Sequence, residues 1–229
     1  MTAHDTKTGD LARQPVGQFL DDLASRTPAP GGGATAALHA AQAAALLTMV
    51  ARYTTGEKYA DSAELVARII EGAGAKRAAA LRLAAEDAAA FTVVTQAYGL
   101  PRATPQDKER RSAAIAAALA AAAGPPAEVI RVARSLMTLA EALLPVANRN
   151  VITDVAAAGE AARAAATTAR LNVEINLGGI RDEAARSDLL GVLEQVDPLI
   201  RRAAAVERSV RTALAAKPTP APPRSRTKP

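Results

Sequence analysis

Pro28-Ala29-Pro30-Gly31-Gly32-Gly33, followed by the small and apolar residues 34–51, is the stretch that decides the fold. The two prolines oppose helix and hold the approach extended, and the three glycines carry no Cβ to keep another group away. A helix that begins between Gly32 and Ala34 would aim free N–H groups and the positive end of its dipole into the space beside the glycines. The loop therefore predicts a site for an anionic or carbonyl-rich ligand. Close packing of two helices over the glycines explains the pattern equally well.

The composition around this stretch indicates a single helical domain. The chain has 229 residues, of which 49% are hydrophobic and only 2% aromatic, and it has no cysteine. Alanine is the best helix former and a poor strand former, so an alanine-rich core requires helices that approach closely over small side chains. No segment shows sustained strand alternation. We therefore predict an all-α fold, an antiparallel bundle of long alanine-rich helices.

Start and stop signals divide this bundle into seven helices. Thr104 to Asp107, for example, combines a capping hydroxyl, a proline at the first helical position and an acid three residues after the cap. The expected helices cover about 16–27, 32–55, 61–98, 105–124, 125–145, 151–177 and 182–216. Residues 1–13 are expected to be a disordered N-terminus, residues 14–216 the helical domain, and residues 217–229 a disordered basic proline-rich tail.

The distribution of charge argues against a nucleic-acid partner. The net charge is +5, but residues 201–229 carry eight basic side chains against one acid, a net of +7, which leaves −2 on the rest of the chain. A slightly acidic body with few aromatics is a poor nucleic-acid surface. Residues 34–51 are long enough for a membrane span, but they include His39, Gln42 and two threonines, so we expect a buried bundle helix and no membrane. We see no signal peptide, and the lack of cysteine is compatible with a reducing cytoplasm.

Polar residues interrupt the apolar pattern at four places. Asp87 follows Glu86 in the middle of an alanine-rich helix, where a surface acid is the simpler explanation. Asn172 and Asn176 lie one turn apart and indicate a buried hydrogen-bonding role toward a helix or a ligand. The other two places are the group Asn148, Asn150 and Asp154, which simple capping would also explain, and the group Thr54, Thr55, Lys58 and Tyr59.

Several kinds of site are excluded by what the sequence lacks. His39 is the only histidine outside the N-terminal segment, so a histidine metal site or a serine–histidine relay has little to build on. No phosphate-binding loop ending in Gly-Lys-Ser/Thr occurs. We therefore expect no metal. An enzyme with this sequence must use carboxylates, amides, lysine and helix dipoles.

Taken in order, these segments resemble the formiminotetrahydrofolate cyclodeaminase and methenyltetrahydrofolate cyclohydrolase family, which occurs as the second domain of formiminotransferase-cyclodeaminase and as a free-standing bacterial enzyme. The resemblance covers about residues 18–182. It is carried by 27–33 (TPAPGGG), 49–58 (MVARYTTGEK), 86–91 (EDAAAF), 100–104 (LPRAT) with Lys108 and Arg111, 147–150 (ANRN) through Asp154, and 172–177 (NVEINL). It implies an all-helical, homodimeric, cytoplasmic domain that binds a tetrahydrofolate derivative as substrate.

The resemblance also suggests roles for particular residues. The methenyl carbon of the folate belongs to a cationic amidinium, so a carboxylate can stabilise it and take a proton from the attacking water. Asp87 and Asp154 are the candidate catalytic residues. The amides of Asn148, Asn172 and Asn176 would orient the pterin ring. Gly31, Gly32 and Gly33 would admit the ring or its glutamate tail, and Lys58 with Arg111 would meet the tail carboxylates.

Three functions remain open at this point. No formiminotransferase domain is present in the sequence, which favours a cyclohydrolase that opens 5,10-methenyl-tetrahydrofolate with water to the 10-formyl form. The first alternative is a cyclodeaminase that closes the 5-formimino form and releases ammonia. The second alternative, of another class, is a non-catalytic helical folate-binding or scaffold protein. Glu57 departs from the basic or small residue expected after the turn, which weakens the role of Lys58.

Overall fold

The computed structural model describes residues 12–216, and this part of the chain contains helices and no strand, so the all-α prediction is confirmed. The predictions for residues 1–13 and 217–229 lie outside the described residues, except that positions 12 and 13 form a turn. The helices of the described part are α1 Val16–Ala24, α2 Gly32–Tyr53, α3 Ala63–Tyr98, α4 Pro105–Ala122, α5 Gly124–Leu143, α6 Thr153–Leu177, α7 Glu183–Leu193 and α8 Val196–Ala215, with short 3-10 turns at Glu57–Ser62 and Arg149–Val151.

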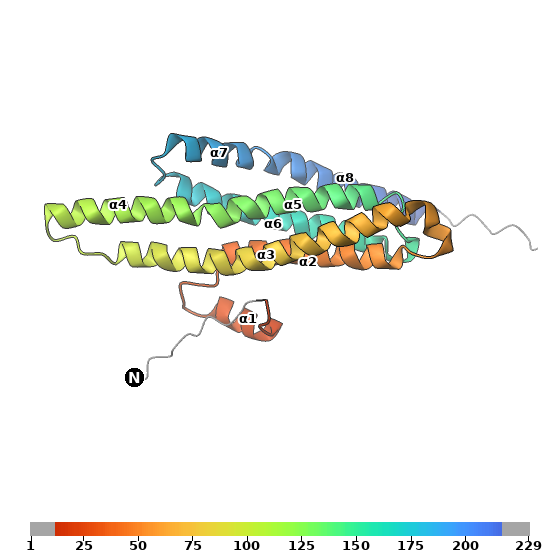
Figure 1. Ribbon diagram of the computed structural model, residues 1–229, viewed down its shortest axis with the longest axis horizontal. Helices are drawn as coiled ribbons and strands as arrows, with labels where there is room; N and C mark the ends of the chain where they lie inside the picture. Colours follow the sequence, from red (N-terminus) through yellow and green to blue (C-terminus); the bar gives the residue numbers. More distant parts are fainter. Residues whose placement is uncertain (1–11, 217–229) are drawn as a thin grey trace, which may run out of the picture.

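Helix α2 is the central helix of the bundle. It packs along α3, α6 and α5 (Figure 1), and most of its buried residues are alanines. Alanine side chains allow helix axes to approach closely, so α2 is covered by three neighbours at once. By length and composition, residues 32–53 and 105–143 also satisfy the criteria for a membrane span. Within this fold, most of residues 32–53 is buried by the other helices.

Helices α3, α4 and α5 form a long hairpin. α3 runs without interruption from Ala63 to Tyr98, through Gly72 and Gly74. The predicted capping box begins α4, where the Asp107 N–H donates to the Thr104 hydroxyl and the Thr104 N–H donates to the Asp107 carboxylate. α5 follows α4 almost in line (Figure 1), after Gly124 and two prolines. The prediction of antiparallel neighbours thus holds for α3 against α4 and α5.

The predicted last helix over 182–216 is wrong in one respect, because the structure divides it into α7 and α8 at residues Glu194 and Gln195. Pro198 explains the division. Proline lacks an N–H, and its ring collides with the carbonyl group four residues earlier, here that of Glu194. A straight helix therefore cannot continue from α7 into α8.

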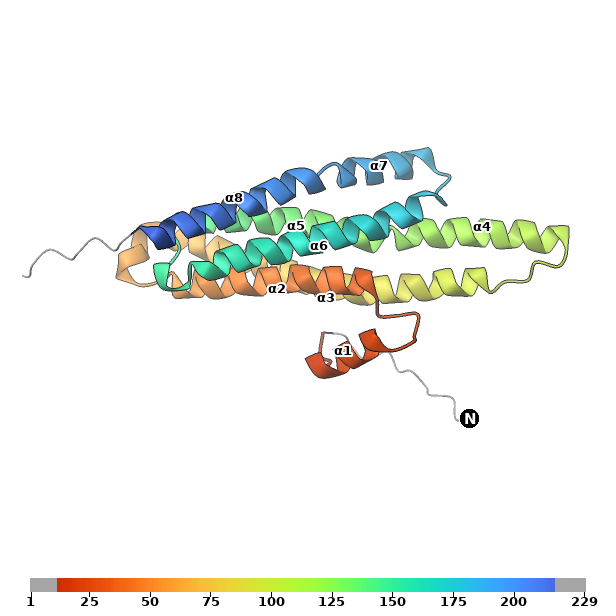
Figure 2. The ribbon, with the colours of Figure 1, turned by 180° about the vertical axis from the view of Figure 1, so that it is seen from behind.

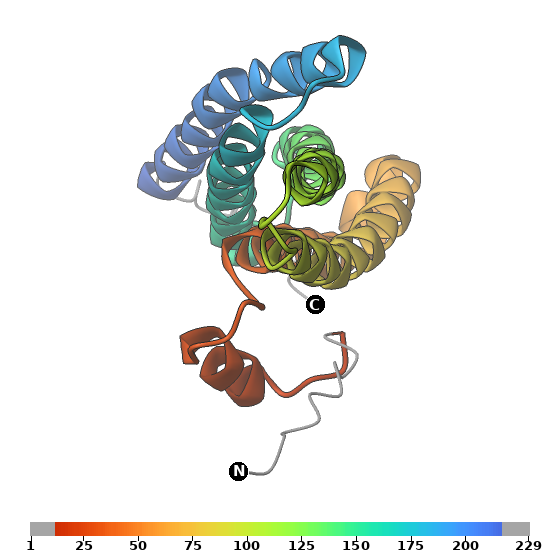
Figure 3. The same ribbon diagram turned by 90° about the vertical axis from the view of Figure 1, so that its left-hand side faces the viewer.

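Helix α1 lies apart from the bundle. Seen along the long axis, α1 stands beyond α2 and α6, and an extended segment connects it to the start of α2 (Figure 3). Its residues Val16 and Leu20 are largely exposed. The other seven helices pack along one another in a continuous bundle.

Candidate active site

The glycine loop leads directly into α2. Gly31 is extended, with φ −144° and ψ −154°, and the helix begins at Gly32 without a side-chain cap. The Ala29–Pro30 peptide bond before it is cis. The N–H groups of the first turn of an α-helix have no partner within the helix, and they lie at the positive end of its dipole. The start of α2 is thus a group of hydrogen-bond donors held in an open turn.

The carboxyl group of Asp87 packs against this turn. A Cβ placed on Gly33 would overlap the carboxyl atoms of Asp87, so the glycine is what allows α3 to bring this acid to α2. The backbone N–H of Ala34 donates a hydrogen bond to the same carboxylate. Burial raises the pKa of Asp87 from 3.8 to about 6, and the hydrogen bond from Ala34 opposes part of that rise. A carboxyl group with this pKa accepts and returns protons near neutral pH.

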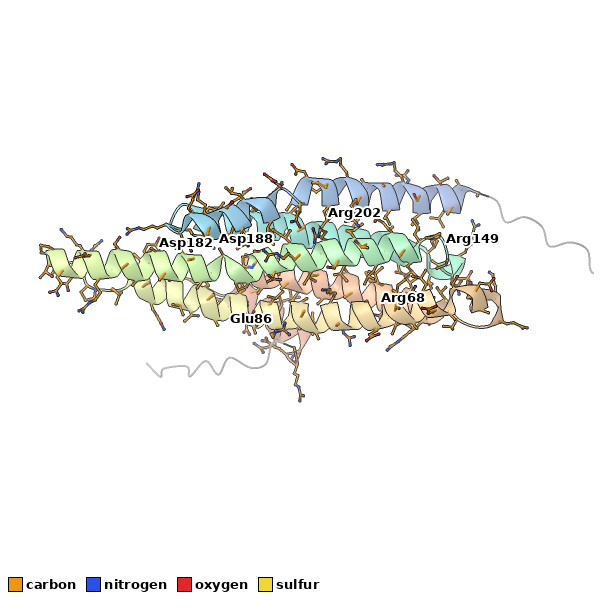
Figure 4. All side chains as sticks on the ribbon, turned by 45° about the horizontal axis from the view of Figure 1, so that its top comes forward. Arg68, Glu86, Arg149, Asp182, Asp188 and Arg202 are labelled. Atoms are coloured by element: carbon orange, nitrogen blue, oxygen red, sulfur yellow. The ribbon has the colours of Figure 1, made fainter. Side chains whose placement is uncertain are left out.

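The neighbouring acid, Glu86, has a different environment. It is exposed on the outer side of α3 (Figure 4), where it pairs with Arg82 at 3.3 Å. Of the two consecutive acids, only Asp87 therefore belongs to the site. The expectation that a surface position is the simpler explanation for Asp87 is wrong.

Asn172 brings a third element, α6, to the glycine loop. A Cβ on Gly32 would lie 3.5 Å from its Nδ2 and 3.8 Å from its Oδ1. The Asn172 Nδ2 group donates to the Thr168 carbonyl at 2.9 Å, and the Asn176 Nδ2 group donates to the Asn172 carbonyl at 2.8 Å. These bonds fix the orientation of both amides along α6. In the described part of the chain, their side-chain oxygens accept no hydrogen bond, so they remain available to a ligand.

Three predicted residues lie at the opposite end of α2. The 22 residues of this helix span about 33 Å, and Asn148, Asp154 and Lys58 are near its C-terminal end. Asp154, the second candidate catalytic residue, therefore does not lie beside Asp87 in the described chain. The physical reason is the length of α2, which separates the glycine loop from everything packed around Tyr53.

Asn148 has a capping role at that end. Its Nδ2 group donates to the Tyr53 carbonyl at 2.8 Å, its backbone N–H donates to the Thr54 hydroxyl at 3.0 Å, and its Oδ1 accepts from the Asn150 N–H at 3.1 Å. The first two bonds hold the turn before α6 against the end of α2, and the third lies within the turn itself. Lys58 is exposed, and its Nζ lies 5.1 Å from the centre of the Tyr59 ring.

Arg111 also has a structural partner. Its guanidinium donates two hydrogen bonds, of 3.1 and 3.3 Å, to the Tyr98 carbonyl and lies over the Tyr98 ring at 5.6 Å. These contacts connect α4 to the C-terminal end of α3. Tyr98 is eleven residues beyond Asp87 on α3, a rise of about 16 Å, so Arg111 lies outside the immediate surroundings of Asp87.

The site also includes backbone groups of Ala34 and Thr168, two residues that were not among the predicted site residues. Both contribute a main-chain group, a donor to Asp87 and an acceptor for Asn172, and an alanine in an alanine-rich helix carries no signal of that role. The three glycines were the feature of the sequence that could have indicated a role for Ala34. Because glycines have no side chain, an acid can come close to the backbone N–H groups that follow them.

The fold and the site together define a class of protein. Its members are all-helical bundles in which a carboxyl group is buried against a helix start lined by glycines. Residues 15–195 match the formiminotransferase-cyclodeaminase family, and the chain belongs to it. The resemblance noted in the sequence is thereby confirmed.

Two curated relatives and one solved structure are similar to the chain. A methenyltetrahydrofolate cyclohydrolase of Methylorubrum extorquens is 39% identical over 177 residues, which is 77% of this chain and 85% of the relative. The formimidoyltransferase-cyclodeaminase of Sus scrofa is 31% identical over 84% of this chain, which corresponds to 35% of that longer protein. The crystal structure of a formiminotetrahydrofolate cyclodeaminase from Thermotoga maritima matches with a TM-score of 0.78 and 31% identity, over 89% of this chain and 99% of the other.

Proposed function

We propose that this chain is a folate one-carbon enzyme, a methenyltetrahydrofolate cyclohydrolase that converts 5,10-methenyl-tetrahydrofolate and water to 10-formyl-tetrahydrofolate. The observation that carries the proposal is the Asp87 carboxyl group, which is packed on Gly33 and has a pKa of about 6. The similarity to the Methylorubrum cyclohydrolase, which extends over most of both chains, supports the same reaction.

The chemistry of the site follows from these groups. The Asp87 carboxylate stabilises the cationic methenyl carbon and takes a proton from the water that attacks it, giving a neutral hydroxylated intermediate. The bond from this carbon to N5 then breaks. N5 receives the proton held by Asp87, and the hydroxyl proton leaves to solvent. The formyl group remains on N10, with one proton released for each cation consumed.

The other residues of the site bind and orient the folate in this proposal. The free side-chain oxygens of Asn172 and Asn176 accept from the donors of the pterin edge. The first-turn N–H groups of α2 donate to its carbonyl oxygen. Among the described residues, no group of three or more His, Cys, Asp or Glu side chains is placed to hold a metal, and the proposed reaction uses none. We place the reaction in the cytoplasm and assign the enzyme a homodimeric state, as the family resemblance implies.

The cyclodeaminase reaction is the second candidate, because the matching Thermotoga structure is a formiminotetrahydrofolate cyclodeaminase. Both reactions pass through the same cationic ring, so the same carboxylate can serve both. Incubation of the purified protein with methenyl- or formimino-tetrahydrofolate, followed by the methenyl absorbance, separates them. Loss of absorbance from the first substrate identifies the cyclohydrolase, and gain from the second identifies the cyclodeaminase.

Two variants make the assay specific for Asp87. Asp87→Asn is expected to lower kcat by at least about a hundredfold, because the proton acceptor is removed. Glu86→Gln is the matched control, since it changes the adjacent exposed acid, and it is expected to leave the rate within about twofold. In the parent, the rate should rise as pH increases through about 6. Folate binding without turnover of either substrate would contradict the proposal and favour a non-catalytic binding protein.

A further inference from the structure

Phe91 is a large apolar side chain at a position where the fold does not bury it. It lies four residues after Asp87 on α3, so the two side chains share one face of the helix and are about 6 Å apart along its axis. The Asp87 carboxyl group packs on Gly33, yet Phe91 is 47% exposed. The apolar cluster that joins α3 to α4 contains Val94 and Ala97, and Phe91 is not part of it. The side of α3 that carries Asp87 thus continues as an open aromatic surface.

The exposure of Phe91 follows from the position at which α2 begins. α2 and α3 are joined by the short segment 54–62 and run antiparallel, and Asp87 meets Gly33 in the first turn of α2. The residues that follow Asp87 on α3 therefore extend past the start of α2 (Figure 1, Figure 2). Phe91 is one helical turn past this point, where α2 no longer covers it. The N–H groups of the first turn of α2 point toward the same region.

Helix α6 passes the start of α2 in the same way. Asn172 lies against Gly32, where a Cβ would be 3.5 Å from its Nδ2, and Asn176 follows one turn later. α6 therefore also continues beyond the start of α2 (Figure 2). Phe91 and Asn176 are thus each about one turn past the first residues of α2, on two helices that flank it. A ligand at the start of α2 would meet a ring on one helix and amides on the other.

The face of an aromatic ring attracts a cation, and two other rings of this chain have one. The Lys58 ammonium lies 5.1 Å from the centre of the Tyr59 ring. The Arg111 guanidinium lies 5.6 Å from the centre of the Tyr98 ring. Among the residues that the structure describes, no basic side chain lies over Phe91 in this way. Its ring is therefore open to a cation from outside, one helical turn from a carboxyl group.

We propose that Phe91 recognises the positive charge of the substrate, through a cation–π contact between its ring and the cationic methenyl ring of the folate, while Asp87 contacts the methenyl carbon. This inference rests on the proposed function. A ligand that touches Asp87 can also reach Phe91, because side chains four residues apart are neighbours and cation–π contacts extend to about 6 Å from the ring centre. The ring stabilises the charge without accepting a proton, so the carboxylate remains free to take the proton of the attacking water.

The contact makes the site selective for the charged form of the folate. 5,10-Methenyl-tetrahydrofolate carries the positive charge, whereas the one-carbon group of 5-formyl- and 10-formyl-tetrahydrofolate is neutral. Cation–π attraction therefore tightens binding of the substrate by about three- to thirtyfold and leaves binding of the neutral product unchanged. Phe91 is in this sense a residue that determines specificity, and it favours release of the product.

The affinities for a charged and a neutral folate test this role without turnover. 5,10-Methenyl- and 5-formyl-tetrahydrofolate are titrated calorimetrically into Asp87→Asn, with and without Phe91→Leu. Leucine keeps an apolar side chain and removes the ring, so the affinity for the methenyl form should fall about tenfold and that for the formyl form should stay within about threefold. Phe91→Tyr retains a ring and should keep both affinities. Equal losses for the two folates, or no loss for the methenyl form, would overturn the proposal.

Steady-state rates in the Asp87 background provide a second readout. Phe91→Leu should raise KM for the methenyl substrate about tenfold without lowering kcat, because the contact is made to a charge that the substrate already carries. Val93→Ala is the matched control, since Val93 is 52% exposed and lies on the opposite side of α3, and its KM should equal that of the parent. A Phe91→Leu variant with lower kcat, lower stability to urea and an unchanged KM would show a structural role instead.

The outcomes separate this inference from the proposed function. A parent that converts 5,10-methenyl-tetrahydrofolate with a KM indifferent to Phe91→Leu keeps the proposed function and refutes the role of Phe91. A parent that acts on neither folate, but whose affinity for the methenyl form alone falls in Phe91→Leu, refutes the proposed function and leaves the recognition of the cation standing.

Discussion

The contact between Gly33 and Asp87 is the residue-scale feature on which the site depends. Gly33→Ala introduces a Cβ that overlaps the Asp87 carboxyl group, so the carboxyl group must move. We expect unfolding free energy to fall by about 1–3 kcal/mol. A displacement of a reacting group by about 1 Å is enough to lower the reaction rate about a hundredfold, so kcat should fall by about that factor or more.

Gly31→Ala is the control for this substitution. Gly31 has a negative φ, and a Cβ built there meets nothing within 4 Å. The unfolding free energy and kcat of Gly31→Ala should therefore stay close to those of the parent. Chemical denaturation and steady-state rates of both variants make the comparison. Equal losses in the two variants would mean that the loop tolerates no side chain at all, and that the contact with Asp87 has no special importance.

The raised pKa of Asp87 also predicts how stability depends on pH. The native carboxyl group has a pKa of about 6 and the unfolded one about 3.8, so between these values the native state binds more protons. Stability contributed at this position is therefore complete below about pH 4 and is lost as pH rises through 6. Asp87→Asn removes the buried charge, and it should be more stable than the parent at pH 7.5 by about 1–2 kcal/mol, after allowance for partial solvent exposure.

Urea denaturation of parent and Asp87→Asn at pH 4 and pH 7.5 provides the measurement. The difference between the two proteins should be near zero at the lower pH and favour the variant at the higher pH. Glu86→Gln is the control, because Glu86 is the adjacent acid and is exposed, and its unfolding free energy should stay close to that of the parent. A variant that is less stable than the parent at pH 7.5 would mean that hydrogen bonding from Ala34 outweighs the cost of burial.

The residue pattern drew attention to Asp87, Asn172 and the glycines, and the family resemblance suggested their roles, but neither showed which of these residues meet. Glycine permits another group to come close to the backbone, but the sequence does not show which group that is. That Asp87 reaches Gly33, and that Asn172 reaches Gly32, depends on how α3 and α6 are packed against α2. The same limit explains Asn148 and Arg111, whose side chains were assigned to a ligand and instead contact backbone carbonyls.

At the scale of elements, the start of α4 offers a direct test of a sequence signal. Thr104→Ala removes the hydroxyl that accepts from the Asp107 N–H at 3.1 Å, and it should lower the unfolding free energy by about 1 kcal/mol. Thr92→Ala is the control, because Thr92 is exposed within α3 and alanine is the better helix former there. Thermal or urea denaturation compares them. A loss in Thr92→Ala as large as that in Thr104→Ala would contradict the capping role.

The ends of helices were predictable where a single residue type starts or stops a helix. The proline and capping threonine of α4, and Gly56, which takes a φ of 94° after α2, act through local sterics and hydrogen bonds. The division between α7 and α8 follows from Pro198 by the same reasoning, and the prediction of one continuous helix overlooked it. The length of α2, about 33 Å, was also predictable, and it already places Lys58 beyond the end of this helix that is opposite to Gly33.

At the scale of the whole molecule, the sequence predicted the class of fold because alanine content and helical periodicity act along every element at once. It could not show which helix faces remain uncovered, since that depends on the complete packing. The side of α2 that stays uncovered is known only from the way α3, α5 and α6 pack around this helix. Charged side chains elsewhere on the surface form ion pairs between and within helices. An example is Arg202, which is labelled in Figure 4 and pairs with Glu141 at 2.8 Å.

The outer side of α2 carries no charged side chain in residues 32–51 and forms a shallow groove with Ala157 and Ala161 of α6. Together with the proposed homodimer, this uncharged face predicts how the stability of the whole molecule depends on its concentration. If two copies bury this face, unfolding is coupled to dissociation, and the midpoint temperature rises with protein concentration. Differential scanning calorimetry from about 2 to 200 µM should show an increase of several degrees for the parent and for the control Ala117→Arg, which changes an exposed alanine of α4. Ala157→Arg should show a midpoint that is lower and independent of concentration, because its monomers unfold alone. Since residues 32–51 carry no charged side chain, 1 M NaCl should leave the concentration dependence of the parent in place, whereas an interface held by charges would lose it.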